Sequence, residues 1–174
     1  KAISDLDEMQ AMLDSTLAFA RDDAAEEPRT QTDLAALLQS LCDDMADAGQ
    51  PVSCETDGRL AYVCAPGAIK RAVQNIVVNA IKYGVSASVE VSEEADRIDI
   101  AVTDRGPGIP ADRREDVFRP FFRLETSRNR ETGGSGLGLA VARSIARRHG
   151  GDIVLEDAGD GGLTVRLSLP HTPM

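Results

Sequence analysis

The sequence predicts an α/β fold, in which a mixed β-sheet is covered by helices and preceded by one long N-terminal helix. Apolar residues recur with helical spacing in some segments and alternate with polar residues, as in strands, in others. The helical segments are 34–48, 66–83 and 139–148, and the clearest strands are 86–92, 97–103 and 163–169. A heptad-like segment at the N-terminus stands apart from these. We therefore expect two parts, residues 1–27 and residues 28–174.

Composition limits what the chain can be. Its 174 residues suit one domain of ordinary size with an appendage, and 42% of them are hydrophobic. With only four Phe and two Tyr, the core should be mainly aliphatic. The net charge of -10 argues against a nucleic-acid partner, and no apolar run approaches membrane-spanning length. The cysteines Cys42, Cys54 and Cys64 lack metal-site spacing, so we expect reduced core residues.

Residues 1–27 carry a heptad seam. Its positions step by three and four: Ile3, Leu6, Gln10, Leu13, Leu17 and Ala20. A helix with such a stripe needs a surface to pack against, because it is unstable alone in water. It could pack on its own domain, but we favour a helix of an intermolecular bundle. Pro28 should end this helix and begin the linker to the main domain. Because the sequence starts inside this pattern, we expect it to be a piece of a longer protein.

The first segments of the main domain should be short strands around one helix. Residues 29–32 suit a short strand, and Asp33 suits the N-cap of the helix 34–48. The pair Asp57-Gly58 is a turn signal between two alternating runs, which we predict to form a hairpin. These runs are residues 52–56 and 60–64.

Pro66 opens the next helix, which carries the first candidate chemistry. Asn75, Asn79 and Lys82 are spaced i, i+4 and i+7, so they share one face of an otherwise apolar helix. Amide oxygens suit Mg²⁺, which takes few protein ligands together with water and phosphate oxygens, and a lysine is a point charge for phosphate. The alternative is an ordinary solvated polar face.

The strand 97–103 delivers Asp104 at its end. Gly106 and Gly108 follow, and they permit the backbone to approach closely there. A carboxylate at the end of a buried strand can accept a hydrogen bond from an amino group of a ligand. Taken alone, the segment fits a plain turn equally well.

Residues 110–134 are predicted to form a long, partly irregular excursion. It includes a short helical stretch at about 112–117 and an apolar cluster around Pro120. Loops of this length within a compact domain are usually lids or disordered. The arginines could reach phosphate or be simply solvated. They are Arg123, Arg128 and Arg130.

A glycine-rich run then leads into the last helix. Residues 133–139 read as a loop feeding a helix N-terminus, whose free N–H groups and positive dipole end suit phosphate. By itself the run could equally be a flexible loop. At the other end of this helix, we explain His149 by the helix dipole and a glycine cap, not by catalysis. Two strands, 152–156 and 163–169, follow.

Four segments, taken in order, resemble the N, G1, F and G2 boxes of the sensor histidine kinase ATP-binding domain. They are residues 75–83, 104–109, 117–123 and 133–139. This domain shares a superfamily with DNA gyrase B, Hsp90 and MutL. The resemblance covers about residues 29–170, and the sequence that flanks the boxes is most similar to that of EnvZ-type osmosensor kinases. It implies a two-layer sandwich of the Bergerat type, with about five to seven strands and three helices on one face.

The resemblance also implies roles for particular residues. Asn79 would be the metal ligand, assisted by Asn75. Lys82 would contact phosphate, and Asn75 and Lys82 are the candidates for catalytic roles. Tyr83 would pack near the adenine, whose amino group Asp104 would bind. The remaining residues implied in nucleotide binding are Gly106, Gly108, Ile109, Phe121, Arg123, Gly134, Ser135, Gly136, Leu137, Gly138, Leu139 and Thr164.

The function implied is that of the ATP-binding catalytic part of a two-component sensor histidine kinase. It would bind ATP and Mg²⁺, donate the γ-phosphate to a histidine and release ADP, for relay to a response regulator. Neither His149 nor His171 has the sequence context of a phosphoacceptor, so we expect that histidine on a dimerisation helix outside this sequence. Residues 1–27 would be the second helix of the same hairpin and would support a homodimer. A cytoplasmic domain of an inner-membrane bacterial sensor is expected.

Two other functions stay open at this point. A catalytically silent, nucleotide-sensing interaction module would share the same fold. An ATPase of the gyrase or Hsp90 kind would need a glutamate base where Asn75 sits, and an amide cannot take a proton from water.

Overall fold

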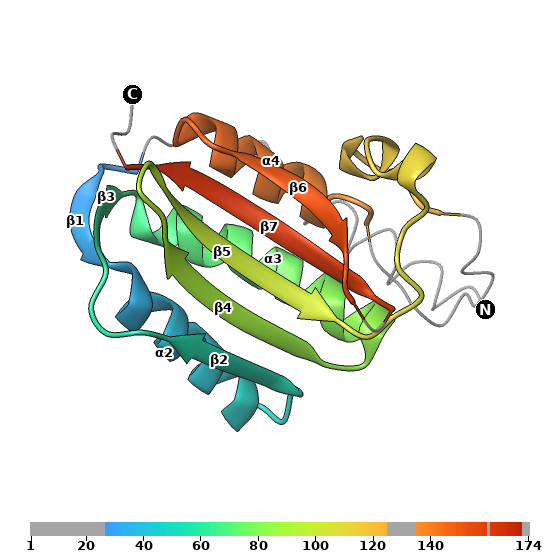
Figure 1. The fold of residues 1–174 in the computed structure, drawn as a ribbon, viewed down its shortest axis with the longest axis horizontal. Coiled ribbons are helices and arrows are strands. Elements are labelled where there is room, and N and C mark those ends of the chain that lie inside the picture. Colours follow the sequence, from blue (N-terminus) through green and yellow to red (C-terminus); the bar gives the residue numbers. More distant parts are fainter. Residues whose placement is uncertain (1–26, 125–134, 160, 172–174) are drawn as a thin grey trace, which may run out of the picture.

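A computed structural model describes residues 27–124, 135–159 and 161–171 of the chain. Three α-helices and seven strands make up this part, drawn in Figure 1. In order these are β1 (Thr30–Asp33), α2 (Leu34–Asp47), β2 (Val52–Thr56), β3 (Ala61–Cys64), α3 (Pro66–Gly84), β4 (Ala87–Glu93), β5 (Arg97–Asp104), the 3-10 turns η1 (Ala111–Arg113) and η2 (Asp116–Phe118), α4 (Gly138–Arg148), β6 (Asp152–Asp157) and β7 (Leu163–Pro170). The bundle helix predicted at the N-terminus lies outside the described residues.

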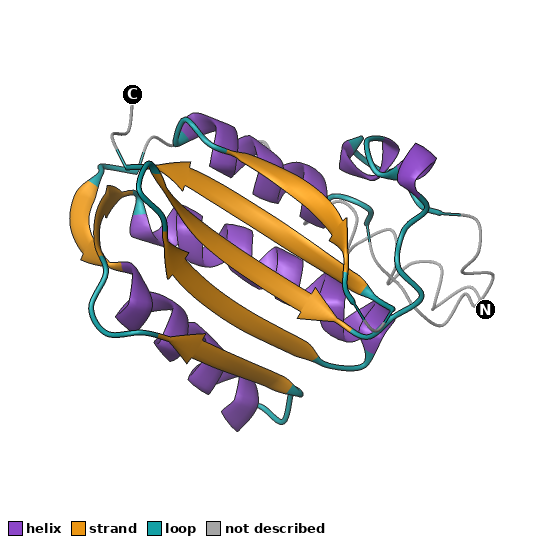
Figure 2. Cartoon of the chain, viewed as in Figure 1, coloured by secondary structure: helices purple, strands orange, loops and turns teal. Residues whose placement is uncertain are grey.

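Five strands form one mixed sheet in the order β2-β4-β5-β7-β6. β2 runs parallel to β4, and the other neighbouring pairs are antiparallel. The three α-helices lie behind this sheet in the view of Figure 2, so the fold has a helical layer and a sheet layer. The predicted two-layer α/β sandwich with three helices on one face is confirmed.

The predicted hairpin between residues 52–56 and 60–64 is wrong. β2 pairs with β4, whereas β3 pairs antiparallel with β1 in a separate two-stranded sheet. The carboxylate of Asp33 accounts for part of this arrangement, because its Oδ1 accepts from the N–H of Leu60 (3.2 Å) as well as from Ala36 (3.3 Å). The N–H of Leu34 also donates to the carbonyl of Leu60 (2.8 Å). These bonds hold the chain after the turn against β1 and away from β2.

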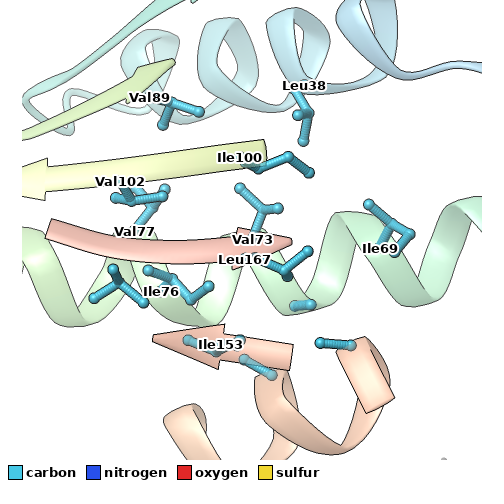
Figure 3. Close-up of a cluster of buried hydrophobic side chains, with 14 of the residues drawn as sticks. Leu38, Ile69, Val73, Ile76, Val77, Val89, Ile100, Val102, Ile153 and Leu167 are labelled. Carbon is cyan, nitrogen blue, oxygen red and sulfur yellow. The ribbon is translucent and has the colours of Figure 1, made fainter. Parts of the chain in front are cut away.

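The core between the two layers is aliphatic, as the composition predicts. Figure 3 shows one apolar stripe of α3 facing the strands. The labelled core residues are Leu38 on α2, Ile69, Val73, Ile76 and Val77 on α3, and Val89, Ile100, Val102, Ile153 and Leu167 on the strands. All are at most 1% exposed, and burial of each such side chain is worth about 1.5–3 kcal/mol. The opposite, polar face of α3 is thereby left to face away from the core.

Other local predictions are refined. The helix expected at about 112–117 is two single 3-10 turns, η1 and η2. The three cysteines are free thiols, with Cys42 and Cys64 buried and Cys54 partly buried. Burial raises the pKa of the Cys64 thiol. Within the described ranges, no helix is both long and apolar enough to span a bilayer.

Candidate functional site

One cavity of about 580 Å³ gathers most of the residues singled out in the sequence. Its walls come from the second half of α3, the loop after β5, residues 122–124, and the start of α4. The predicted site residues that line it are Asn75, Asn79, Lys82, Tyr83, Asp104, Gly108, Ile109, Arg123, Ser135, Gly136, Gly138 and Leu139. The volume lies in the range typical of small-molecule and cofactor sites.

The polar face of α3 forms one wall of this cavity. Asn75, Asn79 and Lys82 all line it, because the neighbouring positions Ile76 and Ala80 hold the helix against the core. The ammonium Nζ of Lys82 lies 5.0 Å from the centre of the Tyr83 ring, a cation–π contact. Two amides, one positive charge and one aromatic ring therefore face the same space.

Asp104 lies at the end of β5 and is only 6% exposed. The N–H of Gly106 donates to its Oδ1 at 2.7 Å, and the N–H of Leu163 also bonds to it. Burial raises the pKa of the Asp104 carboxyl, and these two hydrogen bonds only partly offset that rise. A carboxylate has about four lone-pair sites, so two donors leave acceptor capacity for a ligand in the cavity.

Glycines let the chain turn tightly around the cavity. Gly108 has φ +70°, and a Cβ there would lie 3.2 Å from the carbonyl oxygen of Gly162. Gly136 has φ +69°, and a Cβ there would lie 3.0 Å from the backbone of Phe121. Side-chain-bearing residues rarely adopt such φ values, so both positions favour glycine.

The start of α4 meets the polar face of α3. No side chain caps this helix at Leu137, so its first N–H groups are available to other acceptors. A Cβ on Gly138 would lie 3.5 Å from the amide nitrogen of Asn79, which shows how closely the two helices approach. The positive end of the α4 dipole therefore lies beside the two amides and Lys82, an arrangement suited to an anion.

Some predicted site residues do not line the cavity. Gly106 supports Asp104 from behind, and Leu137 is buried as the residue before α4. Phe121 is 46% exposed, with its N–H donating to the carbonyl of Gly136 (3.1 Å). Thr164 shares a hydrogen bond with Thr103 (2.9 Å between hydroxyl oxygens) on the far side of the sheet. Gly134, Arg128 and Arg130 lie outside the described residues.

Ile109 and Leu139 are the apolar wall residues predicted from the sequence, and the other apolar residues on the walls were not predicted as site residues. They include Val78, Pro107, Phe122, Leu124, Leu163 and Val165. Strand alternation offers a signal for two of them, because residues on either side of Thr164 must face opposite to it. The others look like ordinary core or loop residues in the sequence.

A second hollow of about 720 Å³ lies between η2 and α4. Its lining includes Arg119, Arg143, Arg147 and Arg148. Arg143 is bonded to Glu115 (2.6 Å) and Asp152 (2.8 Å), and its guanidinium lies 4.3 Å from the Phe118 ring centre. Arg119 is paired with Asp116 (3.2 Å) and Arg147 with Asp152 (3.2 Å). Because carboxylates already balance these three guanidinium groups, the hollow is a poorer anion site than the cavity beside α3.

His149 has a structural role. It is 4% exposed; the Ile145 carbonyl lies 2.8 Å from its Nδ1, and the N–H of Ala65 donates to its Nε2 (3.2 Å). Burial lowers the pKa of this imidazole, and the positive charges of Arg29 and Arg148 lower it further. The glycine cap expected after this helix is present, since His149 is the C-cap residue of α4 and Gly150 follows with φ +81°. The buried ring of His149 is held by its two hydrogen bonds. It does not line the cavity.

A mixed sheet covered by helices on one face, with a cavity between a helix bearing amides and an aspartate at a strand end, defines an ATP-binding domain of the Bergerat type. The family model described as "Histidine kinase-, DNA gyrase B-, and HSP90-like ATPase" matches residues 64–173. The chain belongs to this family.

Its curated relatives are sensor histidine kinases. It is 37% identical to GtrS of Pseudomonas aeruginosa over 169 residues, which is 96% of this chain and 34% of GtrS. It is 42% identical to CpxA of Escherichia coli over 106 residues, which is 60% of this chain and 23% of CpxA. The chain thus spans about a third or less of these proteins.

Solved structures agree with this placement. The ATP-binding domain of PrrB from Mycobacterium tuberculosis superposes with a TM-score of 0.69 at 27% identity, over 84% of this chain and 99% of that one. The histidine kinase domain of the E. coli osmosensor EnvZ gives 0.65 at 34% identity, over 86% and 93%. The resemblance to the ATP-binding kinase domain of sensor histidine kinases is confirmed.

Proposed function

We propose that the chain binds ATP in the 580 Å³ cavity and, within a longer sensor histidine kinase, presents the γ-phosphate to a histidine. One observation carries this proposal. Polar groups from three separate segments line a single space: the amides and ammonium of α3, the carboxylate of Asp104, and the start of α4. In phosphoryl transfer a protein mostly positions groups and neutralises charge, which is what such groups can do.

The base and the phosphates would contact different groups on the cavity walls. Asp104 accepts a hydrogen bond from the amino group of adenine, beside the ring of Tyr83. Lys82 and the first N–H groups of α4 bind phosphate oxygens, with Arg123 as a further cation on the wall. The apolar walls around the base exclude water.

The residues present fit a magnesium ion. The amide side chains of Asn79 and Asn75 offer hard oxygen ligands, and Mg²⁺ usually takes one or two protein ligands with water and substrate phosphates. The described residues contain no group of three His, Cys, Asp or Glu side chains arranged for a metal, so phosphate oxygens would complete the ligand set. When bound, the ion would neutralise phosphate charge.

In the transfer, the bond from the γ-phosphorus to the β,γ-bridging oxygen breaks, a bond to an imidazole nitrogen forms, and ADP leaves. The acceptor would be a histidine of the dimerisation hairpin, since His149 is buried with both ring nitrogens bonded. Residues 1–27 would supply the second helix of that hairpin and a homodimer contact. A response regulator would take the phosphoryl group, and the domain would lie on the cytoplasmic side of an inner membrane.

Calorimetric titration of ATP with and without Mg²⁺ tests the site. We expect micromolar binding that Mg²⁺ strengthens. Asp104→Ala should abolish it, and Asn79→Ala should remove the magnesium effect. Gln74→Ala is the matched control, because Gln74 is exposed on α3 and does not line the cavity. A parent chain that does not bind ATP would contradict the proposal and favour an interaction module in which the four boxes serve only as scaffold.

Transfer is tested separately with labelled ATP and an added helix that carries the acceptor histidine. We expect label on the added helix and none on this chain. Strong self-labelling that His149→Ala removes would contradict the proposal.

A further inference from the structure

Three backbone segments converge on Asp104, and each does so at a glycine. Gly84 is the last residue of α3, Gly106 lies in the loop after β5, and Gly162 immediately precedes β7. A Cβ on Gly162 would collide with the main-chain oxygen of Asp104, whereas one on Gly84 would meet the Asp104 side chain itself. Gly84 is therefore the position that bears directly on the carboxylate.

The contact at Gly84 leaves no room for a methyl group. A Cβ there would lie 2.5 Å from Cβ, 2.7 Å from Oδ1 and 2.8 Å from Cγ of Asp104. All three distances are shorter than non-bonded atoms tolerate without moving, and the Asp104 side chain is 6% exposed in closely packed surroundings. Gly84 is buried and its φ is not positive, so its backbone does not itself demand glycine.

The opposite side of the carboxylate is held as well. A Cβ on Gly106 would lie 3.0 Å from the same Oδ1, and the Gly106 N–H donates to that oxygen at 2.7 Å. Oδ1 thus occupies a slot between Gly84 and Gly106. With one oxygen fixed in this slot, the direction of the whole carboxylate is fixed.

We propose that Gly84 is a positioning residue, whose missing side chain orients the Asp104 carboxylate and thereby sets the preference of the cavity for adenine over guanine. This rests on the proposed function, in which Asp104 binds the base. The adenine amino group donates a hydrogen bond to a carboxylate. Guanine carries a carbonyl oxygen at the same ring position, which the carboxylate repels. Displacing the carboxylate therefore weakens ATP binding and relieves the penalty on GTP.

The first experiment compares dissociation constants for ATP and GTP in the parent chain, in Gly84→Ala and in the control Gly159→Ala. A Cβ on Gly159 meets nothing within 4 Å and its φ is not positive, so this control should match the parent. In Gly84→Ala we expect the affinity for ATP to fall about tenfold or more, which is the loss expected when a hydrogen bond to a charged group is misplaced. The affinity for GTP should stay the same or rise, because the carboxylate repels the guanine carbonyl less.

The ratio of the two affinities separates positioning from mere packing. If Gly84 only allowed α3 to pack, both nucleotides would lose affinity equally and the ratio would not change, which would overturn the proposal. The proposal also fails if Gly84→Ala binds ATP as the parent does. Absence of ATP binding in the parent itself would instead refute the proposed function.

A second measurement covers the case in which Gly84→Ala folds poorly. The melting temperature is compared for Gly84→Ala in the parent and in an Asp104→Gly background, where all three contacting atoms are gone. We expect the change to lower Tm in the parent and to raise it in Asp104→Gly, because alanine is the better helix residue once the clash is removed. An equal loss in both backgrounds would show that Gly84 does not act through Asp104.

Discussion

The backbone N–H of Ala65 donates to Nε2 of His149 over 3.2 Å, across 84 positions of sequence. Ala65 precedes α3 as its N-cap residue, and His149 ends α4. Nδ1 of the same ring lies 2.8 Å from the carbonyl of Ile145, so it must carry the ring proton and donate it there. A neutral imidazole of defined tautomer therefore ties the start of one site helix to the end of the other.

This bond predicts acid sensitivity near pH 6. Burial lowers the pKa of His149, so the unfolded state, with the usual value of 6.5, binds its proton first as pH falls. The stability contribution is thus complete above about pH 6.5 and is lost as pH falls from there toward the lower folded pKa. Urea unfolding at several pH values from 7.5 to 5 measures the slope.

His149→Gln is the control for this prediction, because glutamine keeps donor and acceptor atoms but does not titrate. It should be less stable than the parent at pH 7.5 and should show a smaller change in the free energy of unfolding down to pH 5. If both proteins lose stability in parallel, His149 is not the group that titrates.

Substitution of Val85 should stabilise the folded protein, whereas substitution of His149 should destabilise it. It is a β-branched residue with φ +69° at the end of α3, and 80% of it is exposed. The left-handed conformation costs about 1–2 kcal/mol for such a residue, and glycine would remove this strain. Part of the resulting gain in stability is lost, because glycine also increases the conformational entropy of the unfolded chain. Val85→Gly should therefore raise the free energy of unfolding by up to about 1 kcal/mol, or about 2–4 °C in Tm.

The matched control is Val63→Gly. Val63 is also exposed, at 43%, but it lies in β3 and its φ is not positive. Glycine in a strand should lower Tm there. Calorimetric melting of both variants checks the prediction, and a loss of Tm in Val85→Gly would show that its conformation carries no strain.

Much of the fold follows from local signals in the sequence. The N-cap at Asp33 is present as predicted, and α3 starts at Pro66 as its sequence indicates. The prediction of a hairpin was wrong because the Asp57-Gly58 turn signal is local. The pairing of β2 with β4 and not with β3 depends on residues that are distant in the sequence. Local patterns specify the type of an element better than its neighbour.

The site was predictable where its chemistry is polar. Asn79 and Asp104 are conspicuous because polar groups break apolar patterns, and both line the cavity. Phe122 and Val165 line it too, but as apolar residues they resemble core positions in sequence. The slot at Gly84 depends on how closely the end of α3 approaches the Asp104 side chain, which is 20 positions away in the sequence. No sequence pattern encodes such an approach.

Asp152 gives a prediction at low pH. Burial tends to raise the pKa of its carboxyl, but hydrogen bonds from Arg143 and Arg147 outweigh this and lower it to about 2. The stabilisation is therefore present above the unfolded value of 3.8 and is lost as pH falls through about 2. Because the side chain is 45% exposed, solvent screening limits the effect to about 1 kcal/mol at pH 7.

Asp152→Asn should thus lower the free energy of unfolding at pH 7, and the difference from the parent should vanish near pH 2. Denaturant unfolding at pH 7, 4 and 2 checks this convergence. A difference that persists unchanged at pH 2 would mean that packing, and not charge, is responsible.

The carboxylate of Glu27 accepts hydrogen bonds from the N–H of Gly67 (2.9 Å) and of Ala68 (2.8 Å). It caps α3 from 40 positions away and places a negative charge at the positive end of that helix, which has no side-chain cap of its own. Glu27→Ala should cost about 1 kcal/mol of stability and speed hydrogen exchange at both amides.

Glu27→Gln keeps one acceptor oxygen, so its stability and its exchange rates should lie between those of the parent and of Glu27→Ala. Glu55→Ala removes an exposed carboxylate elsewhere and should leave these amides protected. Unchanged exchange at Gly67 and Ala68 in Glu27→Ala would show that water caps this helix equally well.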